Sequence, residues 1–139
     1  MKTKILISII LVIFFICTVS ATDIKDMNFN VSSELQPQDD AVGLGFLDEN
    51  NIVLRILDKN LDDQNSGFTK YNKTVYSYND SMAVGDEQLL MFTYGEYIKI
   101  DGKKYWVDVT YYGAEPNYDK CLEYLEYFNE HNNFEPVEV

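Results

Sequence analysis

Apolar side chains alternate with polar or small ones in several short stretches of the chain, which is typical of half-buried β-strands. In residues 42–47 and 52–57 every even position is apolar, and the intervening residues 48–51 are Asp, Glu, Asn and Asn. These four residues favour a turn. The pattern therefore predicts a β-hairpin with one apolar face.

A second hairpin is predicted around Asp101-Gly102, because this pair readily adopts the positive φ angles of a two-residue type I′ turn. The turn sets the register, so that three pairs share one face: Ile100 with Lys103, Ile98 with Tyr105, and Glu96 with Val107. Shorter β-rich runs at 74–78 and 89–94 predict two more strands. The polar lead-in, residues 22–40, is expected to hold one edge strand at 29–35.

The hydrophobic period changes after Pro116, a favourable first residue of a helix. Apolar residues then recur at intervals of three and four, at Tyr118, Cys121, Leu122, Leu125 and Phe128. This pattern predicts an amphipathic helix of about four turns that ends near Asn132-Asn133. Residues 59–67 are more ambiguous and are interpreted as a short helix that ends at Gly67. Together the segments predict one α+β domain over residues 41–139, with an antiparallel sheet packed by the C-terminal helix.

Residues 1–21 have the pattern of an export signal. Lys2 and Lys4 precede an apolar run at 5–19, and Val19-Ser20-Ala21 resembles the small-residue site of cleavage before Thr22. The pattern predicts a signal peptide and a protein that is secreted or held at the cell surface. The alternative is an uncleaved anchor that tethers the domain to the membrane, because the apolar stretch approaches the roughly 18 to 20 residues that cross a bilayer.

The composition counts against two classes of protein. The chain has 139 residues with 11 basic and 23 acidic side chains, and its formal charge of −12 becomes −14 when Lys2 and Lys4 are removed with the signal. This acidic excess repels a nucleic-acid backbone. The 14% aromatic content gives the chain enough to bury, which counts against intrinsic disorder. The remaining length suits one domain.

Two short motifs carry a resemblance. Residues 100–105 read Ile-Asp-Gly-Lys-Lys-Tyr, and residues 127–133 read Tyr-Phe-Asn-Glu-His-Asn-Asn before Pro136-Val137. In these motifs and in its export signal the chain resembles small secreted archaeal proteins of uncharacterised function, over most of its length after the signal. The order of hairpins and a terminal helix is more remotely similar to the PsbP-like α/β/α sandwich. Neither resemblance implies a catalytic residue or a ligand.

Nucleophilic catalysis has little support in the sequence. His131 is the one histidine and lies at the expected end of the helix, whereas Cys121 lies on the apolar stripe ten residues earlier. Ten residues span about 15 Å of helix, so the two side chains cannot pair within it. Cys121 is expected to be buried and inert, with an intermolecular disulfide as the alternative. One His and one buried Cys do not make a zinc site, and no cofactor is expected.

Carboxylate chemistry is no better defined. Asp58, Asn60 and Asp62 match positions 1, 3 and 5 of an EF-hand loop, but Asp63 and Thr69 stand where that loop requires Gly and Glu. A looser cation site at Asp58, Asp62 and Asp63 is the alternative to a solvated acidic loop. A pair of carboxylates for glycoside cleavage remains open, although 23 acidic residues make any chosen pair uninformative.

Three Asn-x-Ser/Thr triplets begin at Asn30, Asn72 and Asn79. In an exported chain each is a candidate glycan acceptor. Asn72 is the favoured site, because its surroundings have the composition of an exposed loop.

The second face of the Asp-Gly hairpin is the candidate binding surface. If the first face is buried, alternation turns Tyr97, Trp106 and Tyr112 the other way, beside Lys99 and Lys104. Exposed aromatic rings with two lysines would suit a sugar or an acidic partner. In the alternative, a segment such as 59–67 covers this face and the Tyr–Trp pair only stabilises the sheet.

These observations favour an exported, non-catalytic binding module whose partner is a cell-envelope polysaccharide or a protein. The alternatives are a small carboxylate-dependent hydrolase and a membrane-tethered surface protein.

Overall fold

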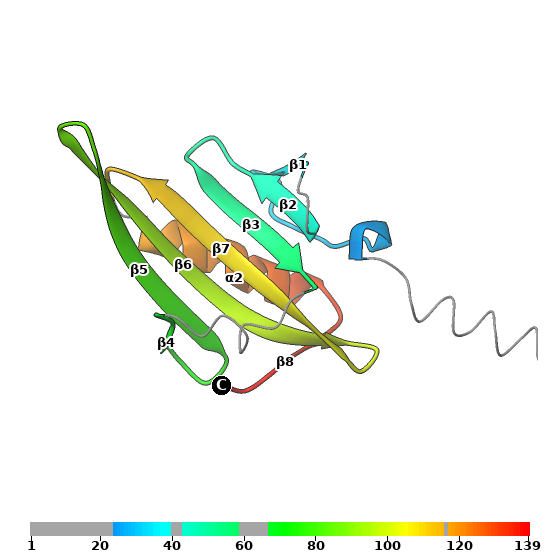
Figure 1. Cartoon of the computed structure of the whole chain (residues 1–139). Coiled ribbons are helices and arrows are strands. Elements are labelled where there is room, and N and C mark those ends of the chain that lie inside the picture. Colours follow the sequence, from blue (N-terminus) through cyan, green and yellow to red (C-terminus); the bar gives the residue numbers. More distant parts are fainter. Residues whose placement is uncertain (1–23, 40–42, 59–66, 116) are drawn as a thin grey trace, which may run out of the picture.

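The computed structural model describes residues 24–39, 43–58, 67–115 and 117–139, most of which form one antiparallel sheet (Figure 1). The 3₁₀ turn η1 (Ile24–Asp26) comes first. The strands are β1 (Gln36–Gln38), β2 (Gly43–Leu47), β3 (Ile52–Leu57), β4 (Thr69–Lys70), β5 (Val75–Val84), β6 (Glu87–Ile100), β7 (Lys103–Gly113) and β8 (Glu135–Pro136). Helix α2 (Tyr118–His131) lies behind the sheet in the view of Figure 1. This mostly β architecture with one C-terminal helix agrees with the expected α+β class.

The sheet order is β1-β2-β3-β7-β6-β5-β4, and β8 pairs with the end of β6. Both predicted hairpins are confirmed. Strands β2 and β3 pair with Leu44 opposite Ile56. The β6–β7 register places Ile100 opposite Lys103, as the Asp-Gly turn requires, and the φ angles of Asp101 and Gly102 are 51° and 81°.

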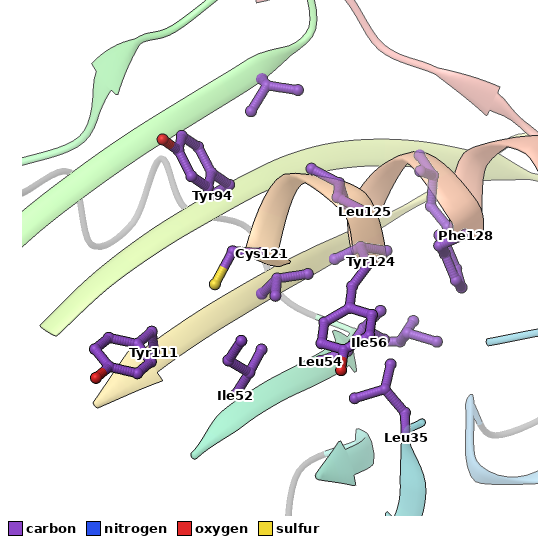
Figure 2. Close-up of a cluster of buried hydrophobic side chains, with 14 of the residues drawn as sticks. Leu35, Ile52, Leu54, Ile56, Tyr94, Tyr111, Cys121, Tyr124, Leu125 and Phe128 are labelled. Carbon is purple, nitrogen blue, oxygen red and sulfur yellow. The ribbon is translucent and has the colours of Figure 1, made fainter. Parts of the chain in front are cut away.

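The main core lies between the sheet and α2. Even residues of β3 and β6 and odd residues of β7 face the helix, and Figure 2 shows side chains of α2 gathered with them. The predicted helical stripe is confirmed at Cys121, Leu125 and Phe128, and Tyr124 joins it with 1% of its surface exposed. Tyr118, at the first turn, is 42% exposed and its ring lies against Phe92.

The runs at 74–78 and 89–94 belong to longer strands than the sequence predicts. Strands β5 and β6 form a hairpin with the two-residue turn Gly85-Asp86, and its tip projects beyond the rest of the sheet (Figure 1). Residues 79–88 are all exposed, so no buried face imposes an alternating pattern on them. Backbone pairing extends the strands there instead.

The prediction of an edge strand at 29–35 is wrong. The edge strand is β1, which begins at Gln36 and places Pro37 on the edge of the sheet. Residues that precede β1 form hydrogen bonds with the C-terminal end of α2. The Asn30 N–H donates to Asn132 Oδ1 at 2.7 Å, and Asn132 Nδ2 donates to the Asn30 carbonyl at 2.8 Å. Ile24 and Leu35 are buried in the core, so the lead-in contributes to packing.

Two predictions fall outside the described residues: the signal peptide at 1–21 and nearly all of the short helix at 59–67. In the part of the chain that is described, no helix has the length and apolar character needed to span a bilayer.

Candidate binding surface

The register defines a second face of the sheet, opposite α2, which we call the open face. Trp106, Asp108, Thr110 and Tyr112 of β7 point to this face, since they alternate with the core residues Val107, Val109 and Tyr111. Along the strands the open face divides into an aromatic end, a polar band and an apolar end.

The aromatic end corrects the predicted binding surface. Tyr97 and Trp106 do share the open face with Lys99 and Lys104, but their exposed fractions are only 4% and 2%. Leu57 is buried with them, and their shielding comes from three partly buried side chains, Phe68, Tyr76 and Val137. The expectation that Tyr97 and Trp106 are exposed is therefore wrong.

Ring contacts explain why this cluster is closed. The Trp106 ring lies 5.1 Å from Tyr97, 5.5 Å from Phe68 and 6.1 Å from Tyr76, measured between ring centroids. Gly95 is required beneath it, because a Cβ at that position would lie 2.0 Å from Trp106 Cζ2. Lys104 Nζ lies 4.6 Å from the Tyr97 ring centroid, so it adds a cation–π contact.

The polar band centres on Asp108, which is only 2% exposed. Arg55 donates through Nε to Asp108 Oδ1 at 3.2 Å and through Nη2 to Oδ2 at 3.0 Å. Trp106 Nε1 also donates to Asp108 Oδ2, at 2.8 Å. Next along the strands, the hydroxyl groups of Thr93 and Thr110 form a hydrogen bond of 2.8 Å with each other. A buried carboxylate needs such partners, so this network fixes the middle of the open face.

The apolar end lies beyond the polar band. Of the seven large apolar side chains that the described residues expose, four lie here: Leu47 at 38%, Met82 at 66%, Val84 at 51% and Tyr112 at 50%. A hollow of ≈ 380 Å³ is lined by Leu47, Asn51, Val53, Leu89, Tyr112 and Gly113. Met82 lies opposite Leu89 on β5, and Val84 lies two residues further along that strand, so neither lines the hollow itself. Exposed apolar side chains gathered around a hollow are typical of an interaction surface.

The five predicted binding residues are therefore divided. Tyr97 and Trp106 are structural, and the exposed Lys99 and Lys104 flank them at the hairpin end. Tyr112 is exposed at the far end of β7 and belongs to the apolar end. The other members of that end were missed, because Leu47 and Val53 come from a distant hairpin that only the sheet order brings next to Tyr112.

Glu96 is the buried carboxyl that the sequence did not mark. It is fully buried between Val75 of β5 and Val107 of β7, and burial raises its pKa from 4.5 to about 7. The amide of Asn129 on α2 opposes this rise. In this structure neither Glu96 carboxyl oxygen has a hydrogen-bond partner, and Asn129 Oδ1 has none either.

The other candidates for catalysis have structural surroundings. Cys121 is fully buried, as predicted, and burial raises the pKa of its thiol to about 12, so the reactive thiolate does not form near neutral pH. His131 ends α2, where its Nδ1 lies 2.8 Å from the Tyr127 carbonyl and its ring stacks on Tyr127. Glu96 lines neither the hollow of the apolar end nor the hollow at the β2–β3 turn.

A second hollow, of ≈ 490 Å³, lies at the β2–β3 turn and contains Asp48. The Asp48 carboxylate already accepts hydrogen bonds from three groups of the protein. Asp48 Oδ1 accepts the N–H groups of Asn50 and Ile52, and Oδ2 accepts the Tyr124 hydroxyl at 2.7 Å. Burial and this hydrogen bond raise the pKa of Tyr124. The contact pins the turn to α2, across 76 residues of sequence.

The described residues contain no group of three or more His, Cys, Asp or Glu side chains able to hold a metal ion. Asp58, from the looser cation site, accepts a hydrogen bond from Lys103 Nζ at 2.6 Å, while Asp62 and Asp63 lie outside the described part.

The three candidate glycan acceptors are all exposed. Asn30 Nδ2 donates to the His131 carbonyl, so this side chain is tied to the end of α2. Asn72 Oδ1 accepts the N–H groups of Thr74 and Val75 in a turn. Asn79 lies in β5.

The chain matches no known family model, no curated protein and no solved structure.

Proposed function

We propose that the chain is an exported, non-catalytic module that binds another protein through the apolar end of its open face. The export pattern at residues 1–21 supports a site of action outside the cytoplasm, secreted or on the cell surface. The observation that carries the binding proposal is a hollow lined by the exposed side chains of Leu47 and Tyr112. The exposed Met82 and Val84 extend this apolar surface along β5, because Met82 lies opposite Leu89 of the hollow.

The geometry favours a protein over a polysaccharide as the partner. Sugar recognition of the predicted kind needs exposed rings to stack on, and the Tyr97–Trp106 pair is covered by Phe68 and Tyr76. The apolar end instead combines Leu, Val, Met and Tyr side chains. Met and Tyr are enriched at protein interfaces, where an apolar centre is surrounded by a polar rim. Arg55 and Asn51 lie beside the hollow and supply part of such a rim.

A binding assay on isolated cell envelopes of the producing cells tests the proposal. Labelled protein should bind untreated envelopes and lose binding after the envelopes are digested with protease. Tyr112→Ser should weaken binding by about tenfold or more, which is the effect expected for an aromatic residue at the centre of an interface. Binding that survives protease and is lost after polysaccharide digestion would contradict the proposal.

Tyr71→Ser is the matched control. Tyr71 is 49% exposed, against 50% for Tyr112, but its ring lies against Tyr94, whose side chain points to the helix side of the sheet. The control variant should therefore bind like the unmodified protein. Equal losses in the two variants would show that any exposed tyrosine matters and that the apolar end is not the site.

A further inference from the structure

Within the described part of the chain, strand pairing covers only a short part of the outer edge of β5. The short strand β4 pairs with β5 only at Tyr76 and Ser77 (Figure 1). Residues 79–84 of β5 are exposed. The carbonyl of Val75 accepts N–H groups from the β4 side, as the Ser77 carbonyl accepts the Thr69 hydroxyl. Because backbone groups alternate in direction along a strand, the N–H and C=O groups of Asn79, Ser81 and Ala83 point outward as well.

One of these outward groups is occupied within the strand. The Ser81 N–H donates to Asp80 Oδ1 at 2.7 Å, and the Tyr78 hydroxyl donates to Asp80 Oδ2 at 3.1 Å. Among the described residues, no backbone bond joins the outward groups of Asn79 and Ala83 to another strand. Residues 79–84 of this strand contain neither a lysine nor a proline, two residues that commonly protect a sheet edge.

A strand added at this edge would extend the open face. Met82 lies opposite Leu89, which lines the hollow of the apolar end, so side chains of an added strand would lie next to Met82 and Val84. On the other side of β5 the outer neighbours are Asn79, Ser81 and Ala83, which are small or polar. The edge therefore specifies apolar side chains on one side of the added strand and small ones on the other.

Charge decides which strand fits. The β5–β6 hairpin from Val75 to Ile98 contains no Lys or Arg, and its exposed ionisable side chains include Asp80, Asp86 and Glu87. A second copy of the chain would bring the same acidic hairpin to this edge. A segment with a lysine or arginine beside Asp80 would instead form an ion pair and release the Ser81 N–H for strand pairing.

We infer that β5 binds an extended segment of the partner protein by strand addition, with apolar side chains beside Met82 and Val84 and a basic side chain beside Asp80. This inference rests on the proposed function, because it names the form in which the partner protein binds.

A synthetic peptide tests the inference without the natural partner. The probe is the labelled octapeptide Thr-Val-Thr-Leu-Thr-Lys-Thr-Lys with blocked ends, whose Val, Leu and Lys side chains share one side of a strand. Fluorescence anisotropy should show binding to the purified protein. The affinity of the peptide with both lysines replaced by glutamate should be lower by a factor of about ten or more. Asp80→Lys should reverse this preference, because it reverses the charge at the edge.

Ala83→Pro tests the backbone contribution. Proline removes the outward N–H of residue 83 while leaving the pairing of Met82 with Leu89, so peptide binding should be lost with the fold retained. Ala83→Thr keeps the N–H and should bind like the unmodified protein. If Ala83→Pro does not fold, the unmodified protein is tested with a peptide that is N-methylated at alternate residues. The methyl groups remove the N–H groups of the peptide that would pair with β5, so this peptide should not bind.

The inference is overturned if the lysine peptide does not bind, if it binds Ala83→Pro or its N-methylated form binds equally well, or if the charge of the peptide has no effect. It is also overturned if the unmodified protein dimerises in sedimentation velocity and Ala83→Pro does not, because the occupant is then a second copy. Envelope binding that depends on Tyr112 but is unchanged by Ala83→Pro would leave the proposed function intact and refute strand addition alone.

Discussion

Replacing Glu96 with glutamine should remove a pH-dependent loss of stability. Burial raises the pKa of this carboxyl from 4.5 to about 7, so between these pH values the folded chain holds a proton that the unfolded chain has released. The contribution of Glu96 to the free energy of unfolding is fully present below pH 4.5. Between pH 4.5 and pH 7 it falls by about 1.4 kcal/mol per pH unit, and above pH 7 it is lost. The total loss is about 3 kcal/mol.

The charged form of Glu96 is costly because the Asn129 amide compensates only part of the cost of burying the charge. Val75 and Val107 flank it on the sheet, Asn129 faces it from α2, and neither carboxyl oxygen has a hydrogen-bond partner. A neutral glutamine of the same shape avoids the cost at every pH. The free energy of unfolding of Glu96→Gln should therefore match that of the unmodified protein below pH 4.5, exceed it by less than about 1 kcal/mol at pH 5, and exceed it by about 3 kcal/mol at pH 8.

Guanidinium unfolding, followed by the fluorescence of the single tryptophan, measures this difference at pH 5, 6, 7 and 8. Glu126→Gln is the control, because it makes the same substitution at an exposed side chain of α2 and should not reproduce the gain of about 3 kcal/mol at pH 8. A stability difference for Glu96→Gln that does not change between pH 5 and pH 8 would refute the reasoning, since the carboxyl would then be ionised throughout.

Three further predictions concern contacts that hold the open face and the helix. Trp106→Ala should lower the free energy of unfolding by about 3–5 kcal/mol, measured by circular dichroism during denaturation, because the side chain is buried and donates to Asp108. Gly95→Ala should destabilise the fold and change the tryptophan fluorescence, since the new methyl group overlaps the indole; an unchanged spectrum would contradict the packing. Tyr124→Phe should cost about 1–3 kcal/mol in the same unfolding assay, because it removes a hydrogen bond to the buried Asp48 carboxylate, and no loss would show that this contact does not pin the turn.

Local signals in the sequence account for the parts of the fold that were predicted. The Asp101-Gly102 pair fixes the β6–β7 register by itself, because its turn geometry needs only those two residues. The C-terminal helix follows from its own hydrophobic period. In both cases the determining residues lie close together in the chain.

The error at Tyr97 and Trp106 has a different cause. Strand alternation gives the face to which each side chain points, and both residues do point away from α2. Whether that face is exposed depends on residues far away in sequence, here Phe68 and Tyr76, and on the space above Gly95. A pattern within one hairpin contains none of this information.

The apolar end and the buried Glu96 were missed for related reasons. Leu47 and Leu89 come to the same hollow as Tyr112 only through the order of the strands in the sheet. Glu96 lies on the same face of its strand as the core residues, so the register implied that it is buried. The sequence gives no further signal that distinguishes it from the other acidic residues, of which the chain has 23 in all.

Photo-crosslinking from position 112 tests the central claim most directly. A photoreactive phenylalanine analogue in place of Tyr112 should join the protein to an envelope protein on illumination, and the same analogue in place of Tyr71 should not. Crosslinks from position 71 alone, or adducts from position 112 that resist protease because they contain only carbohydrate, would contradict the claim that the apolar end of the open face binds a protein.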